Sequence, residues 1–163
     1  MARTASLLPT GAALRSVALG LAAGGRTSLG VAAPVLSWRR SRPGEGRSRL
    51  HGAARAVSFL GVAAELVGDK LPQTPSRLGG GGLAARVLSA VSGAGVLCRR
   101  DRVAPGLPTL AAGVGAALGA VAGAYGGAVW RAWAAERMPA WQGALVEDVV
   151  ALGLAGAAVS DLD

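Results

Sequence analysis

Six charged residues lie inside or at the edges of apolar segments, and their types and spacing point to handling of protons or ions. They are Arg26, Glu65, Asp69, Lys70, Glu147 and Asp148. Glu65 and Asp69 are four residues apart, so a helix places both carboxylates on one face. Glu147 and Asp148 are adjacent and point about 100° apart on a helix, so one of them dominates a given face. We expect these residues to form a polar cluster.

Two interpretations of this cluster remain open. Ionisable groups at membrane depth are typical of proton or ion pathways, with the carboxylates as binding sites and Arg26 as the counter-charge. Alternatively, the acids lie at helix ends near the membrane surface, pair with Arg26 or Lys70, and hold helices in register. Both interpretations require apolar segments long enough to cross a bilayer.

The stretch 103–130 is the clearest such segment, because its 28 residues carry no charge. A run of at least about 18 apolar residues is typical of a membrane span. Gly115, Gly119, Gly123 and Gly127 recur at every fourth position, and alanines form the neighbouring row. On a helix this pattern makes a long face of small residues, where another backbone can approach closely. We therefore predict a glycine-zipper helix that packs through these four glycines.

Composition predicts an all-α protein, a multi-span transmembrane bundle with about four to five spans in a single membrane domain. Apolar residues make up 52% of the 163 residues, but aromatic residues only 4%, so Ala, Gly, Leu and Val must build the core. The expected spans are roughly 12–38, 56–68, 83–98, 108–130 and 140–160. An Arg-rich loop at 39–55 and a Pro/Gly loop at 69–82 separate the early ones. The tryptophans fall near predicted span ends, as at a membrane–water boundary.

The net charge of +8 raises the question of nucleic-acid binding. The arginines, however, lie in the gaps between apolar runs, with few aromatic residues among them. Loop arginines that flank membrane spans account for the same charge. We therefore expect membrane lipid, rather than nucleic acid, as the surroundings of this chain.

The sequence predicts no enzyme. Cys98 and His51 are each the single residue of their type and lie far apart, which makes a metal site implausible. No serine–histidine pair or phosphate-binding loop is evident. We expect no catalytic residue, no metal and no cofactor.

One motif resembles a known family. It runs Glu65-Leu-Val-Gly-Asp-Lys-Leu-Pro72, followed by Thr74-Pro-Ser-Arg77. Three further stretches share the resemblance: Leu19-Gly-Leu-Ala-Ala-Gly-Gly-Arg26, the region from Gly123-Ala-Tyr125 to Arg131, and Glu147-Asp148 with the apolar tail. Together they resemble the domain of unknown function 4126 family of bacterial integral membrane proteins, over most of residues 12–160. The Arg-rich loop at 39–55 departs from the family pattern. The resemblance implies several membrane helices and no activity.

Two functions follow as expectations for a multi-pass protein of the cell membrane. The first is a small transporter or a proton or cation pathway that uses the intramembrane carboxylates. The alternative is a non-catalytic membrane scaffold or assembly protein, packed through small-xxx-small helix faces. A homo-oligomer through the glycine face is the partner that the alternative predicts.

Overall fold

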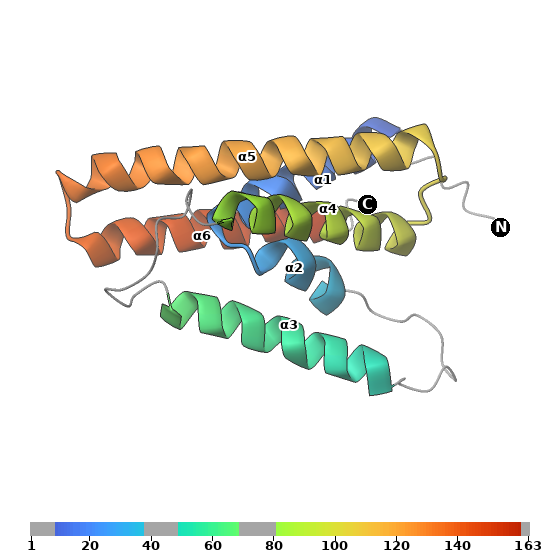
Figure 1. Ribbon diagram of the computed structural model, residues 1–163, viewed down its shortest axis with the longest axis horizontal. Coiled ribbons are helices and arrows are strands. Elements are labelled where there is room, and N and C mark those ends of the chain that lie inside the picture. The colour runs from blue at the N-terminus through green and yellow to red at the C-terminus, as the bar shows by residue number, and fades with distance from the viewer. Residues whose placement is uncertain (1–8, 38–48, 69–80, 161–163) are drawn as a thin grey trace.

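The computed structural model describes residues 9–37, 49–68 and 81–160, and every regular element in these ranges is an α-helix. The helices are α1 (Pro9–Gly25), α2 (Leu29–Ser37), α3 (Arg49–Gly68), α4 (Gly82–Arg100), α5 (Leu107–Ala135) and α6 (Ala140–Val159). The long helices lie side by side, with α3 at the edge against α2 (Figure 1). The all-α expectation is confirmed for the described residues.

Helices α1 and α2 form a hairpin that enters the bundle and returns to the same end (Figure 1). Gly20 of α1 lies against Ala116 of α5, and Gly24 lies one turn further on, against Ala120, so α1 runs parallel to α5. Gly30 of α2 lies beside Ser89, near the middle of α4, and the Ser37 hydroxyl accepts a hydrogen bond from Arg100 at the end of α4. Because α4 and α5 run in opposite directions, α1 and α2 do so too. The turn at residues 26–28 lies inside the bundle, because Gly24 packs against Ala120 and Ala124 in the middle of α5 and Arg26 is 3% exposed.

This hairpin corrects the continuous span expected at 12–38. Gly24-Gly25 favours the end of a helix, and Thr27-Ser28 favours the start of the next one. The Arg26 amide still bonds the carbonyl of Ala22 at 2.8 Å, and the Leu29 amide bonds the carbonyl of Arg26 at 3.0 Å. The chain reverses between these two bonds. Pro34 lies within α2, after the turn.

Helix α3 also differs from expectation. The sequence predicted a loop at 39–55 and a short helix at 56–68, whereas the helix already begins at Arg49. Residues 49–56 include strong helix formers such as Arg, Leu and Ala, so their charges do not prevent a helix. The rest of the predicted loop, residues 39–48, and nearly all of the predicted loop 69–82 lie outside the described residues. The other helices begin and end within a few residues of the predicted spans.

Helices α1 and α5 pack almost backbone to backbone. A Cβ atom on Gly20, Gly24, Gly119 or Gly123 would lie closer than 3.0 Å to a backbone atom of the other helix. Gly115 is looser, because its Cβ would lie 3.1 Å from a methyl group of Val17. Gly127 is half-buried and lines a cavity. The glycine face of α5 is thus covered by α1 of the same chain along most of its length.

The core is built from alanine, and the outer faces are apolar. Leu19, Pro34 and Ser16 are the largest fully buried side chains among the described residues. Large apolar side chains such as Leu118, Tyr125 and Val149 are exposed instead. Three described helices, α4, α5 and α6, are long and apolar enough to cross a membrane. This inverted distribution of small and large side chains matches helices that pack in lipid.

Candidate functional site

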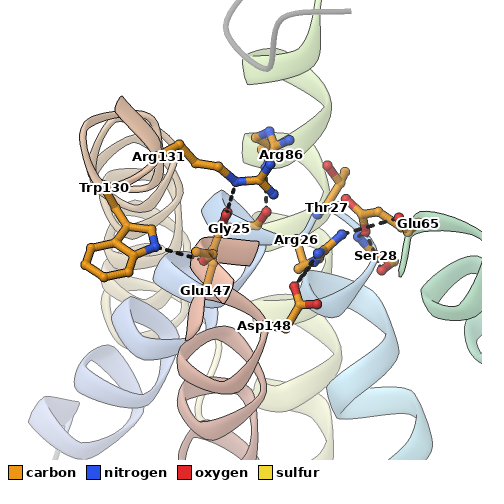
Figure 2. Close-up of polar contacts among 11 residues, drawn as sticks. Gly25, Arg26, Thr27, Ser28, Glu65, Arg86, Trp130, Arg131, Glu147 and Asp148 are labelled. Carbon is orange, nitrogen blue, oxygen red and sulfur yellow. Dashed lines mark hydrogen bonds and ion pairs between the residues drawn. The ribbon is translucent and has the colours of Figure 1, made fainter. Parts of the chain in front are cut away.

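The turn between α1 and α2 is surrounded by charged side chains from four other helices (Figure 2). We call Arg26, Glu65, Arg86, Arg131, Glu147 and Asp148 the turn cluster. Its side chains come from the turn itself and from α3, α4, α5 and α6. The turn exposes the carboxyl end of one helix and the amino end of another, each with backbone groups that lack partners within the helix.

Arg86 of α4 binds the carboxyl end of α1. Its Nη1 donates to the carbonyl oxygens of Gly24 and Gly25, the second at 3.1 Å. The carboxyl end of a helix carries a partial negative charge, so a guanidinium is favoured there. The Arg86 side chain is buried, and this pairing offsets the cost of placing its charge inside the bundle.

Glu65 of α3 binds the amino end of α2. Its two carboxylate oxygens accept hydrogen bonds from the backbone amides of Thr27 and Ser28, both at 2.7 Å. The Ser28 hydroxyl donates a third bond at 2.5 Å. A side chain from another helix thus caps α2 where a local Ser or Asp usually would. Ser89 of α4 completes the turn, because its hydroxyl donates to the carbonyl of Thr27 at 2.6 Å.

Arg26 joins the turn to α6 and α3. Its guanidinium forms an ion pair with Asp148, with Nε donating to Oδ1 at 2.8 Å. Its Nη1 also donates to the backbone carbonyl of Glu65 at 3.3 Å. Arg26 is 3% exposed and Asp148 is 8% exposed. A buried pair of this kind gains little stability against an apolar pair, but removal of one partner is costly.

Glu147 binds the arginine that ends the apolar part of α5. Arg131 Nε donates to its Oε2 at 2.7 Å. The neighbouring Trp130 donates from Nε1 to the carbonyl of Gly143 at 2.9 Å, which fixes the indole against α6. Glu147 and Asp148 therefore face different arginines, in keeping with their angular separation on the helix (Figure 2).

A cavity of about 400 Å³ lies between α1, α5 and α6, beside the turn cluster. Glu147 is the charged residue in its lining, and the rest of the wall is apolar or glycine. The lining residues are Leu21, Gly25, Ala122, Gly123, Gly126, Gly127, Trp130, Val146, Glu147, Val150, Ala151 and Leu154. Ala122, Gly126, Val146 and Val150 of this lining are exposed, so the cavity opens to the outside of the bundle, and the Glu147 carboxylate lies in its wall.

A second group of charges closes the end of the bundle where α1 begins. Asp101 accepts bonds from Arg15 and Arg100, each at 2.8 Å. Arg15 also donates to the carbonyl of Ala158 at 2.8 Å, and Arg100 donates to that of Val159 at 2.9 Å. The two arginines thus cap the carboxyl end of α6 and tie it to α1 and α4.

The structure brings together four of the six residues that the sequence singled out: Arg26, Glu65, Glu147 and Asp148. Asp69 and Lys70 lie outside the described residues. Sequence reasoning missed Arg86 and Arg131 as members of the cluster. Arg86 could have been found, because it is a cation inside an apolar segment, which is the feature that singled out Arg26.

The described residues contain no group of three or more His, Cys, Asp or Glu side chains that could hold a metal ion. The cluster instead combines three guanidinium groups with three carboxylates.

Comparison with known proteins finds no matching family model, no matching curated protein and no matching solved structure. The resemblance to the domain of unknown function 4126 family therefore stays a prediction.

Proposed function

We propose that this protein is a multi-pass membrane transporter that moves a proton or a cation through the turn cluster. One observation carries the proposal: the carboxylate of Glu147, which is 7% exposed, lines the cavity together with Gly25, the last residue of α1 before the turn of the hairpin. Ionisable groups at membrane depth and broken helices with exposed ends are typical of transport sites.

The membrane placement rests on three features. Helices α4, α5 and α6 are long and apolar enough to span, the large apolar side chains face outward, and the charges gather at the turn and at the helix ends. In this placement α1 and α2 form a re-entrant hairpin. Irregular backbone at that depth is tolerated where protein groups satisfy it, and Arg86 and Glu65 do so here.

The proposed orientation follows from arginine placement. The last turn of α4 and the connection to α5 carry Arg99, Arg100 and Arg102 against Asp101, and they lie at the end where α1 begins. The sequence that joins α2 to α3 adds four more arginines against one glutamate. The positive-inside rule places this end in the cytoplasm.

The expected span count depends on this arrangement. Three described helices, α4, α5 and α6, are long and apolar enough to cross a membrane. We propose that α3 crosses beside them and that α1 and α2 form a re-entrant hairpin in place of the first predicted span. The expected four to five spans stay a prediction. The glycine zipper of α5 then serves to hold that hairpin.

Flux through purified protein in liposomes tests the proposal. A membrane potential is imposed, and internal pH is followed with a trapped dye. We expect proton or cation flux from the wild type, and loss of flux from Glu65→Gln and Glu147→Gln. Glu136→Gln is the matched control, because Glu136 pairs with Arg137 at 3.2 Å on the surface, with a side chain 75% exposed.

Two results contradict the proposal at different levels. Wild-type flux no greater than that of empty liposomes, across protons and monovalent cations, overturns the transport function. Wild-type flux in both Glu65→Gln and Glu147→Gln overturns these two site assignments.

A non-catalytic scaffold is the second candidate, and the charge balance favours it. The turn cluster holds three arginines and three carboxylates, so its net charge is zero. Arg86 and Glu65 bind backbone groups of the hairpin, as side chains that hold helices together do. The scaffold predicts a stable partner or self-association. Because α1 covers most of the glycine face, Gly119→Leu would disturb the packing of the hairpin before it disturbed any association between proteins. The scaffold therefore predicts an association through another face, which the oligomeric state of the purified wild-type protein tests.

A further inference from the structure

We propose that the cavity between α1, α5 and α6 binds a lipophilic organic cation, with the positive charge of the ligand at Glu147. The inference rests on the proposed function in one respect, since it names the class of cation that the protein would carry. Its binding test, however, needs no transport.

The lining combines one negative charge with apolar walls. Leu21 of α1 and Val150 and Leu154 of α6 supply aliphatic surface, and Glu147 supplies the charged group. Ligand sites of about 300–1,000 Å³ are typically apolar with a few polar groups that fix orientation. At about 400 Å³ this cavity fits that description, and the sign of its charged wall selects a cation.

The ion pair of Glu147 is unequal in burial. The Glu147 side chain is 6% exposed, whereas that of Arg131 is 34% exposed. Arg131 Nη2 makes no hydrogen bond among the described residues. The carboxylate is therefore fixed in the bundle, while the guanidinium can move outward at lower cost. A cationic ligand can take the place of Arg131 at Glu147 and preserve the local charge balance.

Trp130 gives the cavity an aromatic wall. Its Nε1–H bond to Gly143, and its stacking on Trp133 with ring centroids 5.2 Å apart, hold the indole in place. An indole face attracts cations, most strongly where water is excluded. A carboxylate and a fixed indole beside aliphatic walls favour a cation with apolar substituents over a small hydrated ion.

Glycines keep the cavity open. Gly123, Gly126 and Gly127 line the α5 side, where larger residues would fill the space. A Cβ atom added at Gly126 meets nothing within 4 Å. Gly126→Leu therefore places a side chain beside or within the cavity without a clash of its Cβ. Gly153 of α6 is equally open, and it is not among the lining residues, so Gly153→Leu is the matched control.

The test is equilibrium binding to the purified full-length protein in a non-ionic detergent. The probe is radiolabelled tetraphenylphosphonium, and tetraphenylborate serves as an anion of similar size and shape. We expect tetraphenylphosphonium to bind saturably and more tightly than tetraphenylborate. Glu147→Gln should weaken it by about tenfold or more, because a charge-assisted contact is lost. Arg131→Gln should strengthen it, because the competing guanidinium is gone.

The variants Gly126→Leu and Gly153→Leu test the site even if Glu147→Gln does not fold. Gly126→Leu should abolish most cation binding, and Gly153→Leu should bind like the wild type. Equal binding by these two variants overturns the inference, as does tighter binding of tetraphenylborate than of tetraphenylphosphonium.

The two proposals fail separately. Proton flux without cation binding overturns this inference and leaves the proposed function standing. Cation binding that follows the expected variant pattern, without any flux, supports the site and overturns transport.

Discussion

Arg26 and Asp148 join two parts of the chain that are 122 residues apart, through a bond of 2.8 Å from Nε to Oδ1. Arg26 is the first residue of the turn, and Asp148 lies near the middle of α6. The pair therefore fixes how far the α1–α2 hairpin reaches into the bundle. Because both residues are buried, neither can exchange its partner for bulk water while the bundle stays closed.

Removal of one member of this pair should destabilise the protein strongly. We expect Arg26→Gln or Asp148→Asn to lower the free energy of unfolding by about 3–5 kcal/mol, since each leaves a buried charge without its partner. Unfolding by denaturing detergent in mixed micelles, followed by circular dichroism, measures this change. The double variant Arg26→Met/Asp148→Leu should recover much of the loss. Single variants as stable as the wild type would contradict the pairing.

Glu65 should hold α3 on the bundle through the amino end of α2. We expect Glu65→Ala to cost about 1–2 kcal/mol, as for the loss of a helix cap, and to speed hydrogen exchange at the Thr27 and Ser28 amides. Hydrogen–deuterium exchange with mass spectrometry measures this. Glu65→Gln should have a smaller effect, because its amide oxygen still accepts a bond. Unchanged exchange at both amides in Glu65→Ala would show that the cap contributes nothing.

Two glycines of α5 should respond in opposite ways to the same substitution. A Cβ at Gly119 would press on the backbone of Val17, Gly20 and Leu21, so Gly119→Ala should cost about 1–3 kcal/mol. At Gly113 nothing lies within 4 Å, so Gly113→Ala should stabilise the helix by about 0.5–1 kcal/mol. The same unfolding assay compares them. Equal effects would argue against close packing of α1 on α5.

The sequence predicted the long helices well, because a charge-free run such as 103–130 leaves few alternatives. It also selected Arg26, Glu65, Glu147 and Asp148, because charges inside apolar segments stand out. It missed the reversal at Arg26, since the apolar character of 12–38 continues across the turn. Gly24-Gly25 and Thr27-Ser28 favour a helix end and a helix start at this point. The span at 12–38 was still predicted, because the segment is apolar on both sides of them.

The partners of the charges were beyond sequence reasoning for a different reason. Arg86 binds carbonyls 61 and 62 residues earlier in the chain, and Glu65 caps a helix through backbone amides. Every residue carries the same backbone amide and carbonyl groups, so the pattern of charged residues in the sequence cannot show which backbone groups they bind. The match of Arg86 to the end of α1 emerges when the packing is known.

The re-entrant hairpin is the central claim, and labelling of single cysteines tests it most directly. In a Cys98→Ala background, cysteines are placed at Gly11, Ala104 and Met138, and cells or inverted vesicles are treated with a membrane-impermeant maleimide. We predict that the Gly11 and Ala104 positions react from the same, cytoplasmic side, and the Met138 position from the opposite side. If the Gly11 position instead reacts together with the Met138 position, residues 12–38 form a continuous span and the account is contradicted.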